Sequence, residues 1–146
     1  MFLRSDKISA KTYEAGLLQA KAYRAMTNFM SCELAAFDLS LPDWAMLGLM
    51  MENSHIRPGE LAQELGVKPP VVTANLKRLE AAGLVERRVH DSDSRVSEVS
   101  LTSAGRKRVE SVEASLRNTM RDFLKGIKVS ELISYLNVLT KLAGKL

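Results

Sequence analysis

The pattern of apolar and polar positions is most regular in the middle of the chain. Apolar residues at three- and four-residue steps predict two short helices, which meet at Gly66-Val67, and the second ends at Gly83. Two strand-like runs follow, Leu84–Val89 and Val96–Leu101, and the polar loop His90–Arg95 separates them. Helix, tight turn, helix and hairpin in this order predict a winged helix-turn-helix, which places one helix in a DNA groove and a hairpin beside it.

The chain before this tandem is also helical. Apolar residues at helical spacing predict a long helix over residues 10–38. Pro42 and Asp43 suit the first turn of a second helix, which runs to about Asn53. The side chains expected to be buried in this second helix are Leu47, Met50 and either Trp44 or Met46.

Two more helices are predicted beyond the hairpin. Thr102 is placed to cap a helix over about residues 103–126, which Gly126 ends, and Ser130 is placed to cap the last helix. The apolar stripe of the first is Val109, Val112, Leu116, Met120 and Phe123, and that of the second is Leu132, Leu136, Leu139 and Leu142. A small winged module leaves such stripes without partners, so we expect a homodimer in which terminal helices interlock. The alternative is that these helices pack on their own module.

These elements predict a mainly α-helical protein with a small β-hairpin wing. Residues 41–101 are expected to form the winged helix-turn-helix DNA-binding module. Residues 1–40 and 102–146 are expected to form a helical dimerisation region.

The second helix of the tandem is the expected recognition helix. Pro69 and Pro70 stand in its first turn, where backbone N–H groups have no intrahelical partner. On a helical wheel the buried stripe is Val72, Leu76 and Leu79. The face that points away from the core consists of Pro70, Thr73, Ala74 and Lys77. Either this face meets a DNA major groove or it is simply a solvated helix surface.

The side chains on this face suit base edges and phosphates. Thr73 is able to hydrogen-bond a base edge or to touch a thymine methyl, and Lys77 to reach a guanine edge or a phosphate. Ala74 and Pro70 offer apolar contact. Lys68 and Arg78 flank the face and are predicted phosphate contacts, which fix register rather than sequence.

The hairpin carries a second group of candidate DNA contacts. Its inner face is expected to hold Val85, Val99 and Leu101, and Ile56-Arg57 could add a third strand. Asp93 and Arg95 are close enough to pair, and an arginine at a hairpin tip suits a narrow minor groove. The predicted wing contacts are Arg88, Asp93, Ser94 and Arg95. A polar surface loop with an incidental ion pair is the alternative.

Composition and charge fit a soluble reader of specific sites. The formal net charge is +4, and residues 57–108 hold ten Lys/Arg against seven Asp/Glu. The longest apolar run, Ala45–Met51, is seven residues, so no membrane helix is expected. A single cysteine, Cys32, excludes an intrachain disulfide and favours a reducing cytoplasm. We find no catalytic motif and no metal-ligand spacing around His55 or His90, so we expect neither an enzyme nor a metal or other cofactor.

Several short motifs occur together in the order and spacing of one known family. They are Leu41-Pro42-Asp43-Trp44-Ala45-Met46-Leu47, Glu60-Leu61-Ala62, Leu65-Gly66-Val67, Val72-Thr73, Leu79-Glu80, Gly83-Leu84-Val85, Asp93-Ser94-Arg95 and Leu101-Thr102-Ser103-Ala104-Gly105. By these motifs the chain resembles the MarR (multiple antibiotic resistance) family of bacterial transcription regulators over nearly its full length.

The resemblance implies a homodimer on a pseudo-palindromic DNA operator, usually as a repressor that a small ligand or an oxidant releases. It places Thr73 on a base-contact position and Arg95 on the wing arginine that enters the minor groove. Two departures are Ser94, where the family often has arginine, and Ala74, where a polar residue often follows the threonine. Each departure is expected to remove one DNA contact.

Two further residue types acquire meaning from the resemblance. Some family members sense peroxide through a cysteine of the first helix, but Cys32 lies among Leu34, Ala35 and Ala36 and is interpreted as a small buried thiol. Met46 and Met50 are most simply core residues. They are also the candidate lining of an effector cavity, since family ligands often bind near this helix.

The competing function is a winged-helix module for protein–protein assembly that never meets DNA. Lys77, Arg88 and Arg95 argue against it, because an assembly surface is expected to carry aromatic residues there.

Overall fold

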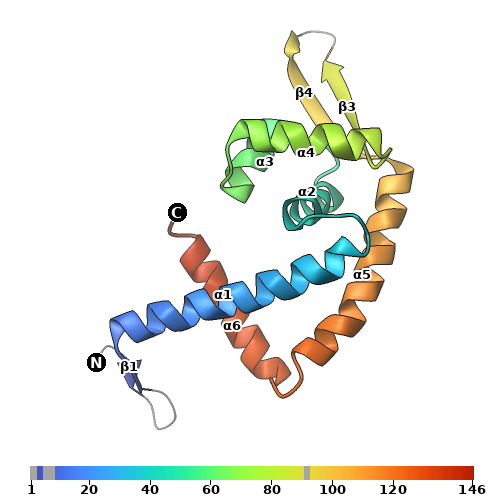
Figure 1. The fold of residues 1–146 in the computed structure, drawn as a ribbon. Helices are drawn as coiled ribbons and strands as arrows, with labels where there is room; N and C mark the ends of the chain where they lie inside the picture. Colours follow the sequence, from blue (N-terminus) through green and yellow to red (C-terminus); the bar gives the residue numbers. More distant parts are fainter. Residues whose placement is uncertain (1–2, 5–8, 91–92) are drawn as a thin grey trace. The chain divides into compact units, whose positions relative to one another are not determined.

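The computed structural model describes residues 3–4, 9–90 and 93–146 and divides into two compact units, residues 1–112 and 113–146. The helices are α1 (Thr12–Ala35), α2 (Leu41–Glu52), α3 (Pro58–Leu65), α4 (Pro69–Ala81), α5 (Ser103–Phe123) and α6 (Val129–Ala143). The strands are β1 (Leu3–Arg4), β2 (Ser9–Ala10), β3 (Val85–His90) and β4 (Asp93–Leu101), paired as two antiparallel hairpins (Figure 1). The predicted fold class, mainly helical with a hairpin wing, is confirmed.

Helix α2 begins with a reciprocal cap that connects Ser40 and Asp43. The Ser40 hydroxyl accepts the Asp43 N–H at 3.2 Å, and Asp43 Oδ2 accepts the Ser40 N–H at 2.7 Å. Pro42 lies in the first turn, as predicted, whereas Ser40 was not predicted as the cap. The helix then buries Asp43, Met46, Leu47 and Met50. Placing α2 in the core makes it the support on which the tandem α3–α4 rests.

A left-handed residue closes α3 and allows the tight turn of the tandem. Gly66 has φ 63°, and its N–H bonds the carbonyls of Ala62 and Gln63. The Val67 N–H also returns to Ala62 O, at 3.1 Å. Helix α4 then starts at Pro69, whose missing N–H would have no partner in a first turn anyway. Leu61, Val72, Leu76 and Leu79 close the core between the two helices.

The hairpin is anchored in the core at its base. Val85 pairs with Leu101, and Val85 and Val99 are buried. Ile56 exchanges two hydrogen bonds with Val99, of 3.1 and 2.8 Å, so the segment that could add a third strand contributes a single isolated β-bridge.

The hairpin strands are longer than the sequence predicted. Strand β4 starts at Asp93, which pairs with His90, so Asp93, Ser94 and Arg95 lie in a strand and not in a loop. The register shifts between Val89 and His90: Val89 pairs with Ser97, whereas His90 pairs with Asp93. Such an irregularity lets the strand continue through polar residues for which the sequence predicts a loop.

The start of α5 is joined to the end of α4 through Thr102. Its hydroxyl donates to Gly83 O at 2.6 Å and accepts the Gly105 N–H at 3.0 Å, which confirms Thr102 as the cap. The Leu84 carbonyl accepts the Thr102 N–H at 3.1 Å. A Cβ atom on Gly105 would lie 1.9 Å from this same oxygen, so residue 105 must be a glycine for α5 to begin here.

The second unit holds the end of α5 and the whole of α6. Gly126 has φ 92° and lies in the turn between them. The cap of α6 is Lys128, whose N–H bonds Glu131 Oε2 at 2.8 Å, so the prediction of Ser130 as the cap is wrong. Glu131, at the third helical position, accepts the Lys128 N–H as the glutamate of a capping box does. The helix therefore begins after Lys128, and Ser130 lies inside its first turn. Helix α6, described over its whole length, has no buried side chain.

Gly105→Ala should destabilise the first unit by roughly 1–3 kcal/mol, the usual range for overpacking, because Leu84 or the start of α5 must move. Urea unfolding measures the change. Gly48→Ala in α2 is the matched control: nothing lies within 4 Å of its added Cβ, so alanine should be neutral or stabilise by up to about 1 kcal/mol. Equal unfolding midpoints for the two variants would contradict the close approach.

Candidate nucleic-acid interface

Helix α4 leads directly into the base of the β3–β4 hairpin, and one of its faces is exposed (Figure 1). Val72, Leu76 and Leu79 are each 1% exposed, as the helical wheel predicts. The opposite face is exposed at each position expected to be so: Pro70, Thr73, Ala74 and Lys77. The structure therefore brings together the recognition-helix residues that sequence reasoning selected.

The hydroxyl of Thr73 already has a partner. Its Oγ1 donates to Pro69 O, one turn earlier in α4, at 3.1 Å. A hydroxyl carries one proton, so in this arrangement the oxygen is left to accept and the methyl group is free to make contacts. Lys68 and Lys77 are exposed at the start and middle of the helix.

Arg78 has a role that the sequence did not reveal. Its guanidinium forms an ion pair with Asp43 Oδ2, and Asp43 is completely buried. The hydrogen bond to Asp43 raises the pKa of Arg78 above its usual value, so the guanidinium stays charged. The same carboxylate oxygen accepts both the N–H and the hydroxyl of Ser40. The ion pair thus connects α4 to the start of α2. The sequence predicted Arg78 as a phosphate contact and did not predict this connection.

The hairpin presents two arginines on opposite faces. Arg87 pairs with Val99 in the register, and Arg88 stands opposite Glu98. Both arginine side chains are exposed. The side chains of Asp93, Ser94 and Arg95 lie outside the described part of the structure.

Met46 and Met50 are core residues. They are 0% and 1% exposed, and neither lines either of the two surface pockets described. One of these pockets lies between the α1–α2 connection, the end of α4 and the start of α5. Its lining includes Phe37, Arg78, Lys107 and Arg108. The interpretation of the two methionines as core holds, and the effector cavity expected beside them is not found in the described residues.

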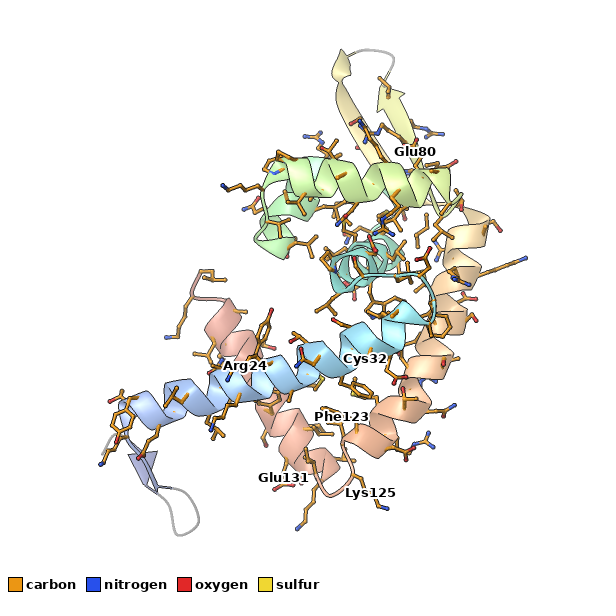
Figure 2. The ribbon with its side chains drawn as sticks, viewed as in Figure 1. Arg24, Cys32, Glu80, Phe123, Lys125 and Glu131 are labelled. Carbon is orange, nitrogen blue, oxygen red and sulfur yellow. The ribbon has the colours of Figure 1, made fainter. Side chains whose placement is uncertain are left out.

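Cys32 is exposed on α1, which corrects the expectation of a buried thiol (Figure 2). The apolar neighbours Ala35 and Ala36 are exposed too, so this side of the α1 end faces away from the core of its own unit. The described residues contain no group of histidine, cysteine and carboxylate side chains suited to a metal ion. Within the same residues no helix is long and apolar enough to span a bilayer.

These elements define the class of fold, a winged helix-turn-helix. Residues 37–96 match the family model described as MarR family, so this part of the chain is similar to that family. The resemblance predicted from the sequence is thereby confirmed.

Similar proteins support the same assignment. An uncharacterised HTH-type transcriptional regulator of Bacillus subtilis, YdgJ, is 29% identical over 101 residues, which are 69% of this chain and 62% of that protein. The chain thus matches less than two thirds of this relative's length. The crystal structure of the transcriptional regulator BldR from Sulfolobus solfataricus is 27% identical, with a TM-score of 0.78 over 94% of this chain and 100% of that one.

A mutant MarR from E. coli, solved in complex with operator DNA, has the same fold. Its identity is 22% and its TM-score 0.76, over 91% of this chain and 99% of that one. The proteins from B. subtilis and S. solfataricus are both described as transcriptional regulators.

Arg78→Met should destabilise the first unit by roughly 1–3 kcal/mol, because it leaves the buried Asp43 carboxylate without its cation. The expected loss of stability is smaller than that for a fully buried ion pair, because the Arg78 side chain is 49% exposed. Urea unfolding is the measurement, and Lys77→Met, which removes an exposed cation, should stay within about 0.5 kcal/mol of the parent. Adding Asp43→Asn to Arg78→Met should recover part of the loss. An unchanged midpoint for Arg78→Met would show that the pair stabilises nothing.

Proposed function

We propose that this protein is a sequence-specific DNA-binding transcription regulator, with α4 in the major groove and the β3–β4 hairpin beside it. The observation that carries the proposal is the exposed face of α4, which leads into the hairpin that carries Arg87, Arg88 and Arg95. Glu80 is the acidic residue of α4 and lies in its last turn, close to the hairpin (Figure 2). The Thr73 end of the helix is therefore free of carboxylates that would repel the phosphates of DNA.

In this proposal the residues of the interface have different roles. Thr73, Ala74, Pro70 and Pro69 meet base edges, and Lys68 and Lys77 meet phosphates or a guanine edge. Arg88, Asp93, Ser94 and Arg95 belong to the wing, where Arg95 enters the minor groove. The E. coli MarR mutant, which shares the fold, was solved in complex with operator DNA, and this supports DNA binding by analogy.

We further propose a homodimer on a pseudo-palindromic operator, in which residues 41–101 bind DNA and residues 1–40 and 102–146 dimerise. Apolar side chains exposed in the single chain support this, among them Tyr13, Leu17, Leu18, Val129, Ile133 and Leu136. Such a surface is typical of an interface that a partner covers. The cytoplasm is the compartment in which a bacterial operator would be met.

The proposed mode of action is repression that a small molecule relieves. A ligand releases DNA only if it binds better to a dimer whose recognition helices are wrongly spaced, and only by that difference in affinity. The exposed thiol of Cys32 makes oxidation the competing signal. The competing function is a protein–protein assembly module, and it predicts no binding to DNA of any sequence.

Thr73→Ala should weaken binding to the preferred operator by roughly 1–3 kcal/mol and binding to scrambled DNA much less. Arg95→Ala should weaken both duplexes similarly and flatten the salt dependence by about one unit per lost contact and subunit. Fluorescence anisotropy with both duplexes at several salt concentrations measures these effects. If Thr73→Ala weakens both duplexes equally, or Arg95→Ala changes neither, the proposed orientation on DNA is wrong.

Leu136→Glu should convert the dimer to monomer at micromolar concentration, since it puts a charge into the apolar stripe of α6. Light scattering measures the mass, and loss of operator affinity should follow. Asn137→Glu adds the same charge on the polar face that also holds Ser130, Ser134 and Lys141, and it should leave the dimer intact. A parent protein that is monomeric in this range would refute the dimer.

A further inference from the structure

Between Lys68 at its start and Lys77 in its middle, the exposed face of α4 lacks a free side-chain hydrogen-bond donor. Its exposed side chains are Pro70, Val71, Thr73 and Ala74, and Val71 is 43% exposed. Three of these are hydrocarbon, and the one hydroxyl proton, on Thr73, is donated to Pro69 O within the helix. The nearest free donor on this face is Lys77, one turn beyond Thr73.

Base pairs differ in the hydrogen-bonding and apolar groups that they present to a protein in the major groove. Guanine offers two acceptors in the major groove, N7 and O6, and needs a donor from the protein. A T·A pair also offers acceptors, thymine O4 and adenine N7, but the C5-methyl group of thymine distinguishes it and suits an apolar contact. A helix-turn-helix contacts base edges with the N-terminal residues of its recognition helix, which here are the residues without a donor.

We infer that the N-terminal half of α4 selects T·A base pairs through thymine methyl groups, with the Thr73 methyl, Ala74 and Pro70 as the contacting groups. Val71 lies at the edge of this apolar surface and shields it from water. Lys77 contacts guanine or phosphate further along the helix. This inference rests on the proposed function and adds the class of base pair that the surface reads.

The alternative for the same residues is that Thr73 acts through its hydroxyl. In that case the bond to Pro69 opens on binding, and the hydroxyl donates to a guanine acceptor. Two substitutions separate the two groups of one side chain. Thr73→Val keeps the γ-methyl and removes the hydroxyl, whereas Thr73→Ser keeps the hydroxyl and removes the methyl. Both remain compatible with the exposed helical position.

The experiment begins with selection of a binding site by the full-length protein from a library of random DNA duplexes. Each thymine of the selected half-site is then replaced by deoxyuridine, which removes only the C5-methyl group. Replacement at a contacted thymine should weaken binding about fourfold per methyl, the effect of exposing one such group. Thymines outside the half-site are the control and should be insensitive.

The variants identify the residue behind each sensitive thymine. Thr73→Val should keep the sensitivity of the selected site to deoxyuridine, because valine retains the γ-methyl group. Thr73→Ser should bind about fourfold more weakly and should lose the sensitivity at one thymine per half-site. This reciprocal loss would not follow from a general weakening of the fold, which would leave the ratio of thymine to deoxyuridine duplexes unchanged.

The outcomes separate this inference from the function on which it rests. Selection of a site in which deoxyuridine is harmless everywhere, or loss of binding in Thr73→Val with retention in Thr73→Ser, overturns the thymine inference and leaves DNA binding established. Failure of the parent protein to enrich any sequence overturns the proposed sequence-specific function and this inference with it.

Discussion

A buried carboxylate organises the winged module. Asp43 lies in the first turn of α2, where it closes the cap with Ser40 and at the same time holds the guanidinium of Arg78 on α4. An ionised carboxylate without partners would be too costly to bury, so α4 must sit where Arg78 reaches it. The ion pair restricts the relative position of α2 and α4, and the apolar side chains of the two helices pack within this restriction. The orientation of the exposed Thr73 face follows from this one pair.

The core packing shows why apolar contacts alone would not suffice. Leu47, Leu76 and Leu79 are buried, but hydrocarbon contacts are non-directional and would tolerate small rotations of α4 about its own axis. A hydrogen-bonded ion pair between two helices is directional and favours one rotation. A reader of base edges needs that restriction, because a rotated helix would present different side chains to the groove.

Local patterns predicted the helices and their buried faces because a helix has a fixed period. Val72, Leu76 and Leu79 were identified from spacing, whereas Gly66 as the end of α3 and Thr102 as the cap of α5 were identified from the residue types that end and cap helices. The errors concern features that spacing does not determine. Strand β4 reaches back to Asp93 because a register shift accommodates polar residues, and Lys128 takes the cap of α6 through a glutamate three residues later. The Asp43–Arg78 pair joins residues 35 apart in the sequence, for which no local pattern exists.

The close approach of Gly105 to the Leu84 carbonyl matters for the design of chimeric proteins as well as for stability. Thr102 bonds both the end of α4 and the first turn of α5, and the missing side chain of Gly105 lets that turn approach the strand. The turn that follows α4, the base of the hairpin and the start of α5 are therefore held together by contacts among Gly83, Leu84, Thr102 and Gly105. A chimera that grafts this module onto the dimerisation helices of another regulator has to cross over after Gly105, since a junction between these residues would separate groups that fit only each other.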